Sequence, residues 1–446
     1  MERRHFISKM AMGAAALSIL PTLDFGSLTF NQDDNKCVKN VLDYIKANWE
    51  KSFYYDKPGV ATRWGVELPF PYSSPSMKGD GEFTFFFYWD TYFTNLGLLR
   101  NGHRVQAKNN IKNILWLIEE QGYMPNHVGI HNRSQSPYLQ LMVRDFFANL
   151  DDPNTEADFF KQCAEGIRKE YQFWMTSRYS QTGLNHFGHH DDAKGCISFY
   201  NRTLIKRLKL DPNVSDEEKR IVGGHYMAEA ENWDFNQRYN GRCMDFNAVD
   251  LNALLYGYEM FLHEAAIKLN WHFKDFYKER AGKRKGLMTE LLWNKEKGWF
   301  FDYDFVNKRQ SEVYAISGLQ PMFMGLATDE QAKRILANLP LLERKYGVAT
   351  TNEVAGCRDY QWAYPVVWPP MVYLTVKSLD QYGFKVDAKR IAEKYIDLHS
   401  KLFEKHGKLF EKTDAETGEL SNADYDAEPM LGWTAGVFVA LAEYVN

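Results

Sequence analysis

Helical periodicity runs through most of this chain and is the feature that most limits how it can fold. Residues 105–122, VQAKNNIKNILWLIEEQG, and residues 250–269, DLNALLYGYEMFLHEAAIKL, each gather their apolar side chains on one face of a helix. Convincing strands with a period of two are scarce. Similar helical patterns occur at residues 37–51, 156–175, 273–292, 329–339, 388–405 and 432–445.

No linker or low-complexity block interrupts these helices. The loops between them are rich in Gly, Pro, Asn and aromatic residues, and loops held by a rigid scaffold are where functional sites are usually built. A chain of 446 residues is long for one domain, but large helical cores of this size occur. We therefore expect residues 31–446 to form a single all-α catalytic domain.

The first 30 residues resemble a twin-arginine export signal. Arg3 and Arg4 precede a short apolar run from Met10 to Leu20, which is too short to span a bilayer. A basic terminus before a first helix is the alternative, and the sequence does not fix the cleavage site. No later stretch is apolar enough for a membrane helix. The prediction is a soluble protein, periplasmic or secreted.

Metal and cofactor sites are not indicated. The five cysteines are widely spaced without a C-x-x-C pair, so they predict neither a zinc site nor a disulfide scaffold, although one or two bridges are compatible with export. The sequence HHDD at residues 189–192 is expected to form a solvated loop rather than a metal site, because side chains adjacent in the sequence seldom converge on one ion. No nucleotide-binding motif is present. We expect no metal and no cofactor.

Composition points to a small neutral ligand. A net charge of -4 gives no electrostatic case for nucleic acid or an acidic membrane as partner, and the oligomeric state is left open. Aromatic residues reach 15%, and several stand beside Asp, Arg or Asn. Flat apolar rings usually form the core, but rings beside polar groups also suit a pocket for a small carbohydrate.

Seven segments rich in aromatic and polar residues follow one another from about residue 81 to the C-terminus: FYWDTYFTNLGLL, MPNHVGIHNRSQSP, ENWDFNQRY, AVDLNALLYGY, LLWNKEKGWFFDYD, QWAYPVVWPP and SNADYDAEPMLGWTAGV. This ordered series resembles the signatures of the trehalase family of glycoside hydrolases. The resemblance implies an (α/α)6 barrel with the pocket at one end, and inverting hydrolysis of an α-glucosidic bond.

Asp234 matches the general acid of that family. Inverting hydrolysis needs one carboxylic acid to protonate the leaving oxygen and one carboxylate to activate water, about 6.5–9.5 Å apart. Trp233 and Phe235 flank Asp234, and an apolar setting would favour its protonated form. Arg238 would lie one helical turn away and bind a sugar hydroxyl or a carboxylate if a helix begins here. Helix capping by Asp234 is the alternative.

The base is predicted by counting back from the Gly-Trp-Thr segment. That count reaches Asp424, where the family has glutamate, and the shorter side chain changes its reach by about one bond. Glu428 is the second candidate and Asp426 the third. An acidic surface turn is the alternative interpretation of this segment.

Other positions resemble a sugar-binding wall. Trp89 and Asp90 match a stacking ring and a hydroxyl acceptor, although core packing and structural ion pairs are alternatives for such residues. Asp250 and Asn252 are expected to begin the next helix. The predicted substrate-binding residues are Phe83, Trp89, Asp90, Asn126, Arg133, Gln135, Arg238, Trp362 and Trp433.

Departures from the family pattern affect substrate recognition. Glu82 stands where trehalases have arginine, Ala363 replaces an acid, and the Gly-Pro-Arg-Pro-Glu-Ser element is missing. The first hypothesis is hydrolysis of trehalose or a related α-linked glucoside. The alternatives are an α-glucosidase or α-mannosidase of the related clan acting on oligosaccharides, and a catalytically inactive carbohydrate-binding barrel.

Overall fold

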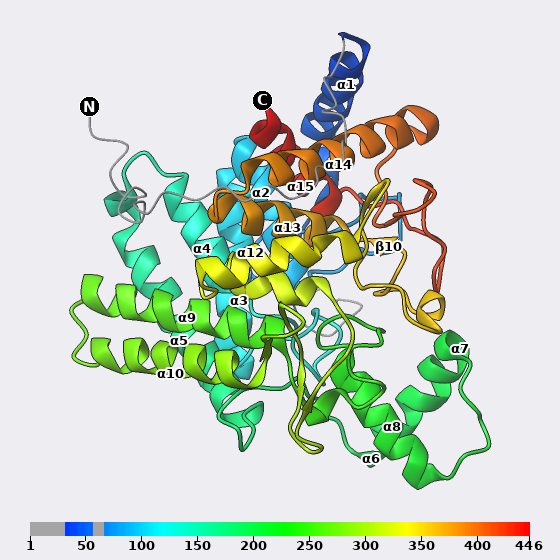
Figure 1. The fold of residues 1–446 in the computed structure, drawn as a ribbon. Helices are drawn as coiled ribbons and strands as arrows, with labels where there is room; N and C mark the ends of the chain where they lie inside the picture. The colour runs from blue at the N-terminus through cyan, green and yellow to red at the C-terminus, as the bar shows by residue number, and fades with distance from the viewer. Residues whose placement is uncertain (1–31, 57–66) are drawn as a thin grey trace.

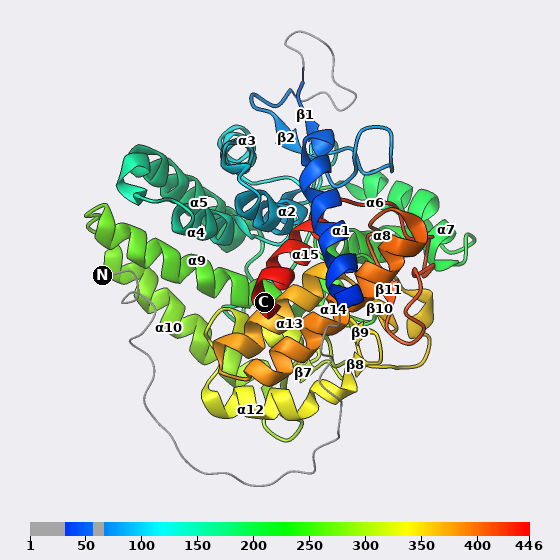
Figure 2. The same ribbon diagram turned by 90° about the horizontal axis from the view of Figure 1, so that it is seen from above.

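The computed structural model describes residues 32–56 and 67–446, and the predicted export signal at residues 1–30 lies outside them. Within the described part, the chain forms two concentric layers of helices (Figures 1 and 2). Among the helices that the structure describes, none combines the length and apolar character that a membrane span requires.

Six helices of the described chain form an inner ring, in which each contacts the next and the last contacts the first. Their outer partners pack against this ring, so the predicted (α/α)6 barrel is confirmed. The inner helices are α2 (Tyr88–Arg100), α4 (Leu139–Ala148), α9 (Val249–Lys268), α11 (Gln320–Phe323), α13 (Pro369–Gln381) and α15 (Gly432–Val445). The outer helices are α1 (Gln32–Asn48), α3 (Arg104–Gln121), α5 (Ala157–Ser177), α10 (Lys274–Leu291), α12 (Asp329–Asn338) and α14 (Lys385–His406).

Short antiparallel strands brace the loops at the ends of the barrel. The pair β10–β11 matters most for the site, because Val366 lies opposite Asp414 and Val367 opposite Thr413, which joins two loops distant in the sequence. The strands are β1 (Phe53–Tyr54), β2 (Tyr72–Ser73), β3 (Phe246–Asn247), β4 (Trp293–Asn294), β5 (Trp299–Phe300), β6 (Tyr303–Asp304), β7 (Arg309–Gln310), β8 (Glu343–Arg344), β9 (Gly347–Val348), β10 (Val366–Val367) and β11 (Thr413–Asp414).

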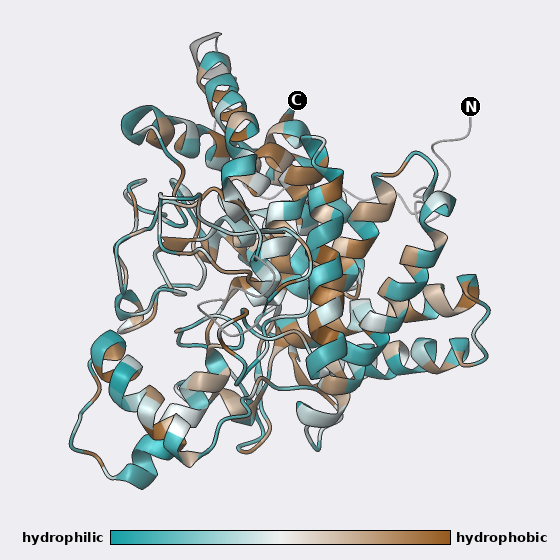
Figure 3. Ribbon diagram, turned by 180° about the vertical axis from the view of Figure 1, so that it is seen from behind, coloured by the Kyte–Doolittle hydropathy of each residue, from teal (hydrophilic) through white to brown (hydrophobic). Residues whose placement is uncertain are grey.

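A helical arm projects from the barrel between α5 and α9. It consists of α6 (Ala193–Phe199), α7 (Ile205–Leu208) and α8 (Asp216–Glu229), and Figure 1 shows it standing apart from the helical layers. Hydrophilic residues alternate with hydrophobic ones along the ribbon of the arm (Figure 3). Its apolar residues form a second, small core that also includes Phe235 of the barrel, so the arm is anchored beside Asp234.

The outer helices agree with the periodicity in the sequence, whereas the inner helices α2, α4, α11 and α13 were not predicted. Helices α2 and α13 bury residues on nearly every side, because they face both the barrel axis and the outer layer, whereas α4 has only ten residues and α11 only four. A helix buried all round lacks the polar face that makes a period of 3.6 visible. The short arm helices were also missed.

Glycine allows helices α2 and α15 to cross closely. A Cβ atom on Gly97 would lie 2.9 Å from the Cα of Gly436, and one on Gly436 would overlap the carbonyl oxygen of Phe93. Backbone atoms cannot move aside as a flexible side chain can. The contact between these two helices therefore depends on the absence of side chains at both positions.

Gly436→Ala should destabilise the protein by about 1–3 kcal/mol, since overpacking forces the two backbones apart. Gly282→Ala on α10 is the matched control, because nothing lies within 4 Å of the added methyl group. Helix propensity should make that control neutral or more stable by up to about 1 kcal/mol. Chemical denaturation measures both, and equal stability of the two variants would contradict the close crossing.

Candidate active site

A cavity of about 550 Å³ lies at the end of the barrel where the inner helices begin. Its walls come from the loops that precede α2, α4, α9, α13 and α15, together with one residue of the arm. The lining residues are Glu82, Phe83, Phe85, Phe87, Trp89, Asp90, Asn126, His127, Ile130, Arg133, Gln135, Arg207, Ala230, Asn232, Asp234, Gln361, Trp362, Trp368, Glu411, Tyr425, Glu428, Met430 and Trp433.

Most of the predicted site residues meet in this cavity. Asp234 lines it, together with eight of the nine predicted substrate-binding residues. Arg238 and Asp424 do not belong to its wall. The predicted residues that share the cavity are Phe83, Trp89, Asp90, Asn126, Arg133, Gln135, Asp234, Trp362 and Trp433.

Stacked tryptophans form one wall of the cavity. The rings of Trp362 and Trp368 are nearly parallel, with centroids 4.0 Å apart, and Trp233 stacks on Trp362 from the loop of Asp234. Trp433 stands perpendicular to Trp368. Trp362, Trp368 and Trp433 line the cavity and present apolar surface beside carboxylates and amides, which suits the apolar face and the hydroxyl groups of a sugar ring, while Trp233 supports Trp362.

The loop that carries Asp234 is held by buried charges. Arg238 donates to Asp250 at 2.7 Å and to Asp302 at 2.8 Å, and its side chain is fully buried. No helix begins at Phe235, so the expectation that Arg238 contacts sugar from the next helical turn is wrong, whereas the alternative that it binds a carboxylate agrees with the structure. Arg238 instead ties the loop to α9, because Asp250 lies in the first turn of that helix.

A second ion pair holds the same loop from the other side. The buried Glu231 accepts from Arg178 at 2.9 Å and from the backbone amides of Ser134 and Gly188. Asn232 bridges Ser136 and Asp250. Both ends of the acidic loop are therefore fixed before any substrate arrives.

The predicted polar residues Asn126, Arg133 and Gln135 help to build the wall. Asn126 and Arg133 both donate to the carbonyl oxygen of Ala230, at 3.1 and 3.2 Å, four residues before Asp234. Gln135 accepts from the backbone amides of Tyr88 and Trp89 at the start of α2. These residues line the cavity and also orient Asp234 and Asp90 through the backbone.

One guanidinium joins both of the predicted catalytic aspartates. Arg207, on α7 of the arm, donates through Nη1 to Asp234 at 2.7 Å and through Nε to Asp424 at 2.7 Å. The Asp234 side chain is 31% exposed, so the expected apolar setting of its carboxylate is wrong. Phe235 turns into the core of the arm instead.

Asp424 lies behind Arg207. Its side chain is 3% exposed and faces the guanidinium rather than the cavity. Its backbone φ is +66°, a left-handed conformation that aspartate adopts more readily than most residues. This placement revises the expectation that Asp424 faces the reacting water, while the second candidate, Glu428, does line the cavity.

Glu411 lies in the cavity wall, although no motif in the sequence predicted it as a site residue. Its carboxylate accepts from the Tyr425 hydroxyl at 3.2 Å and from the Glu428 amide at 3.3 Å, and Lys412 lies 3.9 Å away. Burial raises the pKa of Glu411 to about 7. Burial also lowers the pKa of Lys412 to about 8. Glu411 can therefore exchange a proton near neutral pH.

Asp90 lines the same cavity as Glu411 and Asp234. Burial, with Glu411 and Asp234 nearby, raises the pKa of Asp90 to about 7. On the same wall, burial followed by the charge of Arg133 lowers the pKa of His127 to about 3, so this imidazole is neutral in the physiological range. His127 stacks on Phe85 with centroids 4.7 Å apart. It therefore extends the aromatic wall and adds a polar edge.

Arg207 and Glu411 were not predicted as site residues, because their local sequences contain no functional motif. Arg207 stands in a charged segment, IKRLKL, and Glu411 in LFEKTD, and both segments look like ordinary solvated helix ends or turns. The unusual feature of Glu411 is burial, which only the tertiary structure reveals. Trp368 and Gln361 belong to a segment that the sequence did single out.

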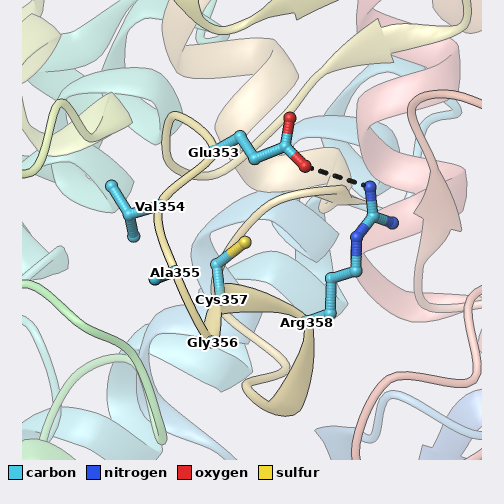
Figure 4. Close-up of a pocket in the computed structure, with 6 residues that line it drawn as sticks. All are labelled: Glu353, Val354, Ala355, Gly356, Cys357 and Arg358. Atoms are coloured by element: carbon cyan, nitrogen blue, oxygen red, sulfur yellow. Dashed lines mark hydrogen bonds and ion pairs between the residues drawn. The ribbon is translucent and has the colours of Figure 1, made fainter.

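Other hollows lack this chemistry. The loop 353–358 encloses a shallow one, where Glu353 and Arg358 form an exposed ion pair at 3.3 Å (Figure 4). His189 and Asp192 line another, and no group of His, Cys, Asp and Glu in the described residues is arranged to hold a metal ion. Cys163, Cys196, Cys243 and Cys357 form no disulfide.

Sequence comparison identifies relatives over nearly the whole chain. A family model described as trehalase matches residues 28–446. The periplasmic trehalase of Xanthomonas oryzae pv. oryzae is 30% identical over 400 residues, which cover 84% of this chain and 68% of the relative. The periplasmic trehalase of Escherichia coli O1:K1 / APEC is 26% identical over 421 residues, covering 86% and 70%.

Solved structures share the fold. The neutral trehalase Nth1 of Saccharomyces cerevisiae superposes with a TM-score of 0.71 at 22% identity, covering 91% of this chain and 80% of the yeast chain. The GH63 mannosylglycerate hydrolase of Thermus thermophilus gives a TM-score of 0.61 at 16% identity, covering 91% and 99%. The barrel is therefore common to enzymes of two glycoside hydrolase groups.

Glu411→Gln should change how stability depends on pH. The fold favours the protonated carboxyl, so wild-type stability should fall as the pH rises from about 4.5, the ordinary value, through about 7. The glutamine variant cannot ionise, and its stability relative to wild type should improve by up to about 3 kcal/mol between pH 5 and pH 8. Chemical denaturation at both pH values measures this difference.

The exposed Glu290 on α10 supplies the control for that measurement. Glu290→Gln should leave the difference between pH 5 and pH 8 at the wild-type value, since a solvated carboxylate has a similar environment in both states. A flat response of Glu411→Gln would show that Glu411 is not desolvated in the folded protein.

Proposed function

The chain belongs to the trehalase family of glycoside hydrolases, and we propose that it hydrolyses trehalose or a closely related α-linked glucoside with inversion, using Asp234 and Glu411. The observation that carries the proposal is one sugar-sized cavity in which these two carboxylates, from different loops, share a wall with stacked tryptophans. Inverting hydrolysis requires two such carboxyl groups with space for one water molecule.

Asp234 is proposed as the proton donor, in line with the family resemblance of its segment. It has the exposure to reach a glycosidic oxygen, at 31% of its side chain. Its carboxylate accepts a hydrogen bond from Arg207 at 2.7 Å, and both side chains line the cavity.

Glu411 is proposed as the base in place of Asp424. It reaches the cavity, whereas Asp424 is enclosed behind Arg207. Its pKa of about 7 suits acceptance of a proton from water near neutral pH. Tyr425, whose hydroxyl donates to Glu411 at 3.2 Å, fixes the orientation of the carboxylate.

The substrate is a neutral sugar on this proposal. Glu82, Asp90 and Glu428 add further acceptors for hydroxyl groups around the two catalytic carboxylates, and Arg133 and Arg207 supply donors. Glu82 stands where the trehalase pattern has a substrate-binding arginine, so this part of the wall offers an acid in place of a cation. A related α-linked glucoside is therefore the second candidate substrate.

The site of action is proposed to be the periplasm. The relatives from Xanthomonas oryzae and Escherichia coli are named periplasmic trehalases. The pair Arg3 and Arg4, followed by an apolar run, supports a twin-arginine export signal over residues 1–30. Residues 31–446 are proposed to form the single catalytic domain that remains after export.

Asp234→Asn and Glu411→Gln should each lower kcat on trehalose by at least about 10²-fold, because acid and base catalysis each contribute about 10²–10⁴-fold. Both variants should keep the wild-type circular dichroism spectrum. Proton NMR of the first turnovers should show one β- and one α-glucose per trehalose, since inversion changes one anomeric centre and leaves the other.

Asp275→Asn, an exposed change of the same kind on α10, is the control and should retain full activity. Release of α-glucose alone would exclude inversion. Well-folded wild-type protein that leaves every α-linked glucoside intact would favour the carbohydrate-binding alternative.

Glu82→Arg should distinguish trehalose from other substrates. This change restores the arginine of the trehalase pattern at the cavity wall, where a guanidinium can make paired hydrogen bonds to hydroxyl groups. The KM for trehalose should fall by about 10-fold with kcat little changed, since one good hydrogen bond contributes about 1–2 kcal/mol. Glu82→Gln is the control, because it removes the carboxylate without adding a guanidinium. It shows how much of the change in KM comes from loss of the acid alone. A higher KM for trehalose in Glu82→Arg would indicate another substrate.

A further inference from the structure

A single arginine connects the arm, the acid loop and the C-terminal loop. Arg207 belongs to α7, Asp234 to the loop before α9, and Asp424 to the loop before α15. Its guanidinium donates to both carboxylates at 2.7 Å and also lies 4.5 Å from the centre of the Phe235 ring. Three segments far apart in the sequence therefore meet at one side chain.

We propose that Arg207 is a positioning residue that uses Asp424 as a fixed anchor to set the direction of the Asp234 carboxyl group across the cavity. The proposal rests on the proposed function, in which Asp234 donates the proton. It assigns Asp424 an indirect role, since this carboxylate contacts Arg207 and does not line the cavity.

The geometry suits an anchor. The Asp424 side chain is 3% exposed, that of Arg207 is 24% exposed, and that of Asp234 is 31% exposed, so the chain of contacts runs from the interior outward to the cavity. A buried ion pair keeps its geometry better than a solvated one, because water does not compete for its hydrogen bonds. Asp234, the most exposed of the three side chains, is the group that must contact the substrate.

The small apolar core of the arm holds the helix that carries Arg207. Tyr200, Leu204 and Tyr226 form the small core of the arm together with Phe235, which follows Asp234 directly in the chain. The same core thus holds the helix of Arg207 and the backbone beside Asp234. Moving the arm would move the guanidinium and the loop together, which keeps their relative position constant.

The nearby cations are committed to other partners. Arg133 donates to Ala230 and Asn132, and the ammonium group of Lys412 donates to the carbonyl oxygen of Ala423. They influence Asp234 through charge at longer range. Besides Arg207, the titratable groups that interact electrostatically with Asp234 are Asp90, Arg133, Glu229, Lys412 and Tyr425.

A double-mutant cycle tests the proposal. Arg207→Ala should lower kcat on trehalose by about 10²-fold with a smaller change in KM, since a displacement of about 1 Å in a catalytic group can cost that much. Asp424→Asn should lower kcat by about 10-fold. The double variant should be no slower than Arg207→Ala alone, because Asp424 acts only through the guanidinium.

Two matched variants separate positioning from structure. Arg220→Ala removes an exposed ion pair with Glu217 on the same arm and should leave kcat within about two-fold of wild type. Arg207→Lys keeps the charge but has no fork to bridge two carboxylates, so it should rescue little. Added guanidinium ion should restore part of the activity of Arg207→Ala and none in Arg220→Ala.

Hydrogen–deuterium exchange gives a readout that needs no turnover. Arg207→Ala should speed amide exchange in residues 421–428, whereas Arg220→Ala should not. Unchanged exchange would overturn the proposal even if the wild-type enzyme cleaves trehalose. Additive losses in the double variant, or Arg207→Ala within two-fold of wild type, would also overturn it. A wild-type enzyme inactive on all α-linked glucosides, with faster exchange in Arg207→Ala, would refute the proposed function and leave the anchor standing.

Discussion

The buried ion pairs around residues 229–238 are the constraint on which the site depends. Arg238 is held between Asp250 and Asp302, and Glu231 is held by Arg178, with almost no exposure at any of these side chains. Loss of one partner would leave an uncompensated buried charge, at a cost of about 3–5 kcal/mol. Such a network is a poor source of stability compared with apolar packing, but it fixes one conformation of an otherwise irregular loop.

The barrel places this loop beside the other loops that line the cavity. Each inner helix begins at the same end of the ring, so the loops before α2, α4, α9, α13 and α15 converge there. Pairing of β10 with β11 then brings Trp362 and Trp368 close to Glu411. The close crossing of α2 and α15, which depends on glycine, sets Asp90 beside the C-terminal loop. Distant segments thus reach one cavity through helix packing together with the β10–β11 pair.

Sequence patterns predicted the parts of this arrangement that have a local signature. Outer helices show a polar face, and the aromatic segments around Trp89, Asp234 and Trp433 carry the family resemblance, so both were found. Arg238 was misplaced because its segment looks helical when its buried partners are unknown. Counting residues back from the Gly-Trp-Thr segment could not show that the Asp424 side chain points toward Arg207 while the Glu411 side chain lines the cavity. The burial and direction of a side chain are set only when the chain folds.

The environments of the two proposed catalytic carboxyl groups differ in a way that no local pattern contains. Glu411 is desolvated, which favours its neutral form, whereas the Asp234 side chain is partly exposed and accepts a hydrogen bond from Arg207. The proposed role of Glu411 therefore depends on the loss of its proton near neutral pH, whereas the proposed role of Asp234 depends on the direction in which Arg207 holds its carboxyl group. Arg207 itself is fixed by the buried Asp424, so the interior of the protein sets the direction of a group that meets substrate at the cavity.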